Sequence, residues 1–172
     1  RDEGAAVRDL RITNFGAGAA VGSPGGEVTF DGVSVTDNAV GVRGGPKGRI
    51  AVRDSVVSDN DVGVAPGEGA RLSITESTLS GNRDAAVSTD LGHSMELRRS
   101  TVRENGTGVA AGEGTFVDNA ITDNDGVGLR LIGLVAPADL GSATVVGNEV
   151  RNNAGAGIEF ASCGGKVRGN AI

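Results

Sequence analysis

Apolar residues recur along this chain at fixed distances from a repeated asparagine. Segments such as VTDNAVGV at 35–42 and VSDNDVGV at 57–64 return six times, in variant forms, and their asparagines are separated by 22, 22, 23, 19 and 29 positions. These residues are Asn38, Asn60, Asn82, Asn105, Asn124 and Asn153. A repeat of this length is typical of a solenoid, in which each unit stacks on the next.

Three apolar positions in each unit predict three short strands. The first set lies eight residues before the asparagine, the second three before it and the third four or five after it, as in Val52, Val57 and Val64. Small or polar residues alternate with them, as expected of strands with one buried face. A unit of roughly 22 residues has no room for a helix as well. The pattern therefore predicts an all-β parallel β-helix of about seven to eight coils, right-handed by the usual crossover preference.

The repeated asparagines are expected to form a ladder inside the coils. Asparagine tolerates a left-handed backbone, and its amide both donates and accepts hydrogen bonds. A second column of small hydrogen-bonding residues stands five positions earlier, at Ser55, Ser77, Ser100, Asn119, Asn148 and Asn170. Residues 7–21 read as a degenerate first coil with Phe15 in the ladder position.

These repeats resemble the right-handed parallel β-helices of the pectin lyase-like superfamily. The likeness covers nearly all of residues 1–172, which we interpret as one domain of a longer protein. It implies the fold but leaves the activity open, because this fold carries lyases, hydrolases, epimerases and non-catalytic surface proteins.

Composition narrows the range of partners. The formal net charge is −6 and the pI about 4.8, which argues against nucleic acid as a partner. The longest apolar run, 131–138, is too short for a membrane span. The single cysteine, Cys163, permits no internal disulfide. Aromatic residues make up 2% of the chain, so the rings that usually stack on sugars are scarce.

One acidic column is a candidate for chemistry. The position six before the ladder asparagine holds Asp54, Glu76, Arg99 and Asp118 on successive coils. Active members of the superfamily use clustered carboxylates to hold calcium or to act as acid and base, so the resemblance implies a calcium site at Asp54, Glu76 and Asp118, with Arg99 or Arg98 assisting. The plainer interpretation is that these residues cap a turn.

Two other groups of polar residues are weaker candidates. Asp37, Asp59, Glu104 and Asp123 directly precede ladder asparagines, where solvated turn residues are expected and loose cation binding is the alternative. His93 and Asp90 form the one conceivable His–carboxylate pair. The sequence Gly92-His93 is similar to part of a polygalacturonase motif, but Ser94 replaces the glycine that follows. We therefore expect an ordinary surface histidine.

An insertion at 130–142 accounts for the longest spacing between ladder asparagines. It carries an apolar cluster that we expect to be exposed, made of Leu131, Ile132, Leu134 and Val135. A loop folded over the outside of the coils, a contact with another chain or domain, and an active-site lid all remain open. The contact would allow self-association.

Short turns and scattered acids favour a non-catalytic scaffold or binding module of an extracellular or cell-envelope protein, with polysaccharide or other protein domains as partners. The alternative is an enzyme acting on acidic glycans, a lyase, hydrolase or epimerase, with calcium as its cofactor. Convergence of Asp54, Glu76 and Asp118 in one groove would favour the enzyme.

Overall fold

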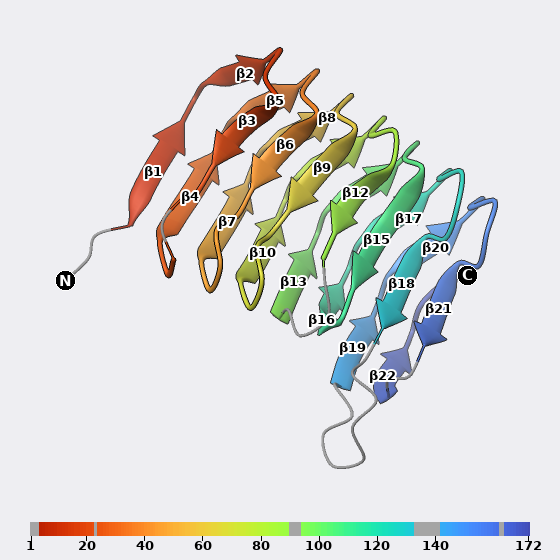
Figure 1. Ribbon diagram of the computed structural model, residues 1–172. Helices are drawn as coiled ribbons and strands as arrows, with labels where there is room; N and C mark the ends of the chain where they lie inside the picture. The colour runs from red at the N-terminus through yellow and green to blue at the C-terminus, as the bar shows by residue number, and fades with distance from the viewer. Residues whose placement is uncertain (1–3, 23, 90–93, 133–141, 162–163) are drawn as a thin grey trace.

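Parallel strands stack coil upon coil in the computed structural model, which describes residues 4–22, 24–89, 94–132, 142–161 and 164–172. The strands of one sheet lie side by side from red to blue, and the two ends of the chain lie at opposite ends of the stack (Figure 1). Every strand pairs in parallel with the equivalent strand of the next coil. The predicted all-β parallel β-helix is confirmed.

Three sheets run the length of the stack. Sheet A has eight strands: β1 (Ala5–Arg8), β4 (Glu27–Asp31), β7 (Arg49–Arg53), β10 (Arg71–Thr75), β13 (Ser94–Arg98), β16 (Glu113–Val117), β19 (Ser142–Val146) and β22 (Gly164–Arg168). Sheet B has seven: β2 (Arg11–Thr13), β5 (Ser34–Thr36), β8 (Val56–Ser58), β11 (Thr78–Ser80), β14 (Thr101–Arg103), β17 (Ala120–Thr122) and β20 (Glu149–Arg151). Sheet C has seven: β3 (Ala17–Ala20), β6 (Val40–Arg43), β9 (Val62–Ala65), β12 (Ala85–Ser88), β15 (Thr107–Ala111), β18 (Leu129–Ile132) and β21 (Ile158–Ala161).

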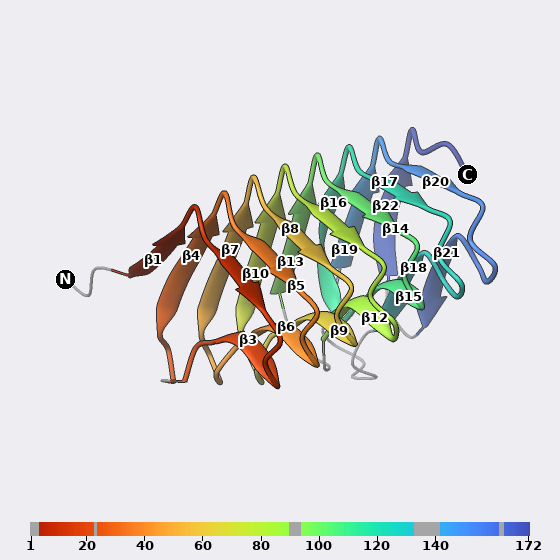
Figure 2. The same cartoon turned by 90° about the horizontal axis from the view of Figure 1, so that it is seen from above.

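Two tight turns separate the three strands of each coil before the chain returns to sheet A. We call the bend between sheets A and B the first turn and the bend between sheets B and C the second turn. Viewed from above, the first turns form a row of peaks along one edge (Figure 2). No helix in the described ranges is long and apolar enough to cross a membrane.

The core consists of columns of apolar side chains, one column for each predicted anchor. Val52, Val57 and Val64 of a single coil are all fully buried, and their equivalents above and below stack on them. Alternating positions on each strand face outward, which follows from the two-residue period of a β-strand. The three-strand coil read from the sequence is therefore confirmed.

The asparagine ladder is also confirmed. Each side-chain nitrogen donates to the side-chain oxygen of the asparagine one coil on, over Asn38–Asn60 (3.0 Å), Asn60–Asn82 (3.1 Å), Asn82–Asn105 (2.8 Å), Asn105–Asn124 (3.0 Å) and Asn124–Asn153 (2.7 Å). The backbone N–H of Phe15 donates to Asn38 Oδ1 at 3.0 Å, so Phe15 does occupy the ladder position of the first coil.

A second ladder stands in the first turn. Backbone N–H groups there donate to the hydroxyl or amide oxygen of the next coil, as from Ser55 to Ser77 at 3.2 Å and from Asn119 to Asn148 at 3.0 Å. Both ladders satisfy turn groups that the sheets leave without partners. Such groups would be costly to bury unbonded.

The left-handed residues lie one position earlier than the asparagines. Asp37, Asp59, Glu104 and Asp123 have φ between 56° and 58°, while the ladder asparagines that follow them do not have positive φ. The expectation that asparagine itself adopts this conformation is therefore wrong. The preceding residue makes the bend, so that the asparagine side chain can point inward to the ladder.

The glycines of sheet C that lie beside the ladder are explained by close packing between coils. A Cβ on Gly108 would lie 2.2 Å from the carbonyl oxygen of Gly128 and 3.3 Å from the amide nitrogen of Asn124. The coils approach too closely there for a side chain. The glycines at this position of sheet C are therefore set mainly by the nearby carbonyl of the next coil, although Ala86 of β12 stands at the same register position.

Leu131 corrects one expectation about the insertion. It lies in β18 and is 0% exposed, because Leu129 and Leu131 are alternate inward positions of that strand. It is therefore a core residue and is not available for self-association. Ile132 is half-buried, and Leu134 and Val135 lie outside the described residues.

Candidate functional site

The acidic column Asp54, Glu76, Arg99 and Asp118 occupies the first turn. All four residues have positive φ, between 46° and 55°, so each makes the bend between a sheet A strand and the next sheet B strand. Arg99 Nε lies 2.7 Å from Glu76 Oε1, and both side chains are about half exposed. The column therefore forms a ridge on the outside of the turns, where the Glu76 carboxylate is already paired.

These acids do not gather round a common ligand position. In the described part of the chain, no group of three or more His, Cys, Asp or Glu side chains has a geometry that could hold a metal ion. Arg98, the other assisting candidate, forms an ion pair with Glu96 on its own strand. The catalytic and calcium-binding roles inferred for this column stay predictions.

The second acidic row projects from the second turn. The side chain of Thr122 and the amide of Asn152 hydrogen-bond to Asp123, and they hold the pKa of its carboxyl below the usual value. The amide contact is 3.1 Å long and joins adjacent coils. Asp37 accepts a similar bond from Thr13 at 3.3 Å. The row therefore strengthens the turns.

Some of the predicted residues cannot be placed. His93, Asp90 and Cys163 lie outside the described residues, so the His–carboxylate pair stays a prediction.

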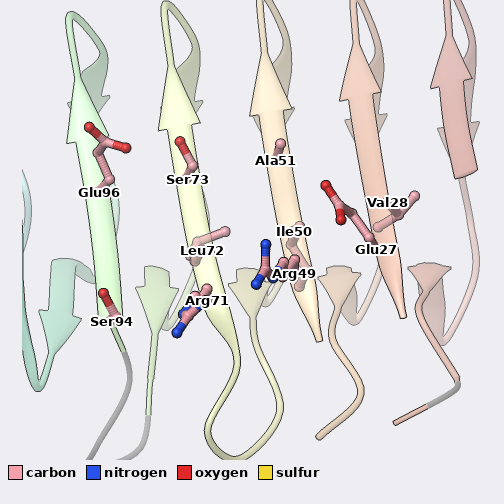
Figure 3. Close-up of a pocket in the computed structure, with 10 residues that line it drawn as sticks. All are labelled: Glu27, Val28, Arg49, Ile50, Ala51, Arg71, Leu72, Ser73, Ser94 and Glu96. Atoms are coloured by element: carbon pink, nitrogen blue, oxygen red, sulfur yellow. The ribbon is translucent and has the colours of Figure 1, made fainter. Parts of the chain in front are cut away.

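A cleft that the sequence reading missed lies on the outer face of sheet A. It has a volume of about 270 Å³ and crosses strands β4, β7, β10 and β13. The outward side chains that line it are Glu27, Arg49, Ala51, Arg71, Ser73, Ser94 and Glu96, drawn as sticks in Figure 3. Ala51 and Ser73 form a low floor, since both are small and stand on adjacent strands in register. We call this feature the arginine cleft.

Two like charges stand side by side in the arginine cleft. Arg49 and Arg71 are register partners on β7 and β10, whose backbones are about 4.8 Å apart. Like charges directly opposite one another destabilise a sheet. Neither guanidinium forms an ion pair with a described residue. The pair is therefore an unneutralised positive charge on a protein whose net charge is −6.

The two carboxylates of the cleft stand at opposite sides of this pair. Glu27 is on β4 and Glu96 on β13, with Arg49 and Arg71 between them (Figure 3). Three strand spacings separate β4 from β13, or about 14 Å. The carboxyl pairs of glycosidases lie roughly 5 to 9.5 Å apart. Glu27 and Glu96 therefore stand on strands that are farther apart than the carboxyl pairs of glycosidases.

A sequence signal for this cleft did exist. Arg49 and Arg71 each stand eleven positions before a ladder asparagine, so their side chains had to meet on one face of neighbouring coils. Glu27 and Ser94 share the same offset and extend the row on either side. A column of exposed arginine and glutamate lacks the apolar or purely acidic pattern that predicts a strand or a cation site.

Comparison with known proteins identifies the repeat. The family model described as a right handed beta helix region matches residues 1–136, which is more than half of the chain. No curated protein and no solved structure matches the chain significantly.

Proposed function

Because the chain belongs to the family of right-handed β-helix proteins, we propose that it is a non-catalytic scaffold that binds carbohydrate on the outer face of sheet A. The single observation that carries this proposal is the arginine cleft. It offers an open floor at Ala51 and Ser73 with guanidinium donors beside it, and its two carboxylates stand on strands about 14 Å apart.

The rest of the chain supports a scaffold. Both ladders and the buried columns continue through the coils that carry the cleft, so its walls belong to a rigid stack of strands. Binding residues held on strands need little ordering when a ligand arrives, which lowers the entropic cost of binding. An extracellular or cell-envelope location is part of the proposal and rests on the resemblance alone.

A binding assay on immobilised acidic and neutral polysaccharides tests the proposal. We expect wild-type protein to bind at least one of them. Ala51→Phe, which fills the floor of the cleft, should abolish that binding. Ala65→Phe is the matched control, because Ala65 is an equally small outward residue on β9 of sheet C. Equal binding by both variants would refute the proposed site.

Incubating the protein with the same polysaccharides also tests whether it is an enzyme. Release of new chain ends, with or without calcium, would show that the protein is a polysaccharide-active enzyme and would make Asp54, Glu76 and Asp118 the first residues to replace. Binding without release is the expected result.

A further inference from the structure

The chemistry of the ligand group can be inferred from the arginine cleft. We propose that Arg49 and Arg71 together bind a phosphomonoester group, with the hydroxyls of Ser73 and Ser94 as further donors. This inference rests on the proposed function, since it takes the outer face of sheet A as the binding face. It adds the identity of the bound group.

Charge is the first argument. Two guanidinium groups on adjacent strands repel each other, and neither has an ion-pair partner among the described residues. A phosphomonoester carries a charge of about −1.5 to −2 at neutral pH, which balances two arginines. A carboxylate or a sulfate ester carries a single negative charge and leaves one arginine unbalanced.

Donor geometry is the second argument. Each guanidinium presents a fixed fork of N–H groups, and one carboxylate is filled by a single fork. A phosphomonoester has three terminal oxygens, so it can accept hydrogen bonds from both guanidinium groups and from a serine hydroxyl as well. Ser94 is the register partner of Arg71, and Ser73 is two residues beyond Arg71 on the same strand face, so both hydroxyls adjoin the pair.

The negative charge of Glu27 disfavours an anion at its end of the cleft. It is the register partner of Arg49 on the other side, and no ion pair forms between them. Its charge opposes any anion in the cleft. Glu96 has a partner in Arg98 and opposes the anion less. We therefore expect the phosphate to lie on the Arg71 side of the pair, away from Glu27.

Calorimetric titration of the whole chain with inorganic phosphate, glucose 6-phosphate, glucuronate and the sulfate ester glucose 6-sulfate, at equal ionic strength, tests the inference. Phosphate and glucose 6-phosphate should bind, and glucuronate and glucose 6-sulfate should bind at least tenfold more weakly. Equal affinity for glucuronate would overturn the phosphate assignment. The proposed function would survive that failure if a neutral immobilised polysaccharide bound the wild-type protein and did not bind Ala51→Phe.

Substitutions locate the site. Arg49→Gln and Arg71→Gln should each weaken glucose 6-phosphate binding at least tenfold, and Glu27→Gln should tighten it. Arg53→Gln is the matched control, because Arg53 is an exposed arginine on the same strand and face as Arg49, forms no ion pair with a described residue and does not line the cleft. An equal loss with Arg53→Gln would show non-specific attraction and overturn the inference.

A stability readout separates this role from a structural one. If the arginine pair is retained for a ligand, Arg71→Gln should raise the Tm of the free protein slightly, because it removes the repulsion, and should abolish the rise in Tm that phosphate causes. A lower Tm with an unchanged phosphate effect would overturn the inference. Vesicles containing phosphatidic acid, tested beside glucose 6-phosphate, distinguish a lipid headgroup from a sugar phosphate as the source of the group.

Discussion

Replacing Asn82 with leucine tests the ladder at its centre. Asn82 is 0% exposed, and its side chain makes hydrogen bonds in both directions along the stack. Its Oδ1 accepts from the backbone N–H of Asn60 at 3.2 Å, and its Nδ2 donates to Asn105 Oδ1 at 2.8 Å and to Val57 O at 3.2 Å. Leucine has a similar size, so the main effect is the loss of polar partners.

The size of the destabilisation follows from the polar groups that lose a hydrogen-bond partner. The Asn60 N–H is left buried without an acceptor, at about 1–3 kcal/mol, and the two lost donor bonds add about 1 kcal/mol each. Asn60 Nδ2 keeps its carbonyl acceptors, so it adds little. The buried leucine offsets about 2 kcal/mol of the total. We expect a net loss of about 2 kcal/mol in the free energy of unfolding.

Urea unfolding followed by circular dichroism measures this loss, since the chain has no Trp or Tyr for fluorescence. Hydrogen exchange gives a local readout, because the Asn60 amide should exchange faster in the variant. Asn153→Leu is the control: Asn153 is the last ladder residue and is half-buried, so water can replace its bonds and the expected cost is below about 1 kcal/mol. An unchanged midpoint for Asn82→Leu, or an equal loss at both sites, would refute the reasoning.

Three further substitutions test other parts of the structure. Gly108→Ala should lower the free energy of unfolding in urea by about 1–3 kcal/mol, because its Cβ would lie 2.2 Å from a carbonyl oxygen. Gly16→Ala is the control and should be neutral, because a Cβ there would have no atom within 4 Å. Equal effects of the two substitutions would contradict the packing argument. Phe15→Asn should raise stability by about 1 kcal/mol by extending the ladder into the first coil, and a lower Tm would count against that position being a ladder site. Thr122→Val should raise the pKa of Asp123 in an NMR titration, because it removes the main hydrogen bond to the carboxylate. Since that pKa is lowered in the fold, its stabilising effect is present above the ordinary carboxyl pKa and is lost as the pH falls through the lowered value, and an unchanged titration would contradict the assignment.

The coil could be predicted from sequence because each structural column keeps a constant offset from the ladder. The offsets of Val52, Val57 and Val64 predict three buried strands, and the offset of Phe15 predicts the ladder position of the first coil, as the structure confirms. Register in a stack follows directly from such offsets, because parallel strands pair residue for residue.

The sequence predicts the site only in part. The equal offset of Arg49 and Arg71 places them side by side, but whether a partner neutralises their charge is shown only by the structure. The prediction that Leu131 is exposed was wrong for a related reason. Its apolar neighbours suggested a surface cluster, whereas the continuation of β18 turned it toward the core.

The stacking of coils also determines how this protein would respond to tension. The two ends of the chain lie at opposite ends of the stack, so a pull between them acts along the stack and across the strands (Figure 1). Every interface between coils then carries the load, but the outermost coil has a neighbour on one side only, so it detaches first. A coil of roughly 22 residues occupies about 4.8 Å of the stack when folded and extends to about 75 Å when released. Under force, the molecule would lengthen one coil at a time, in steps of about 70 Å, and would absorb mechanical work at each step.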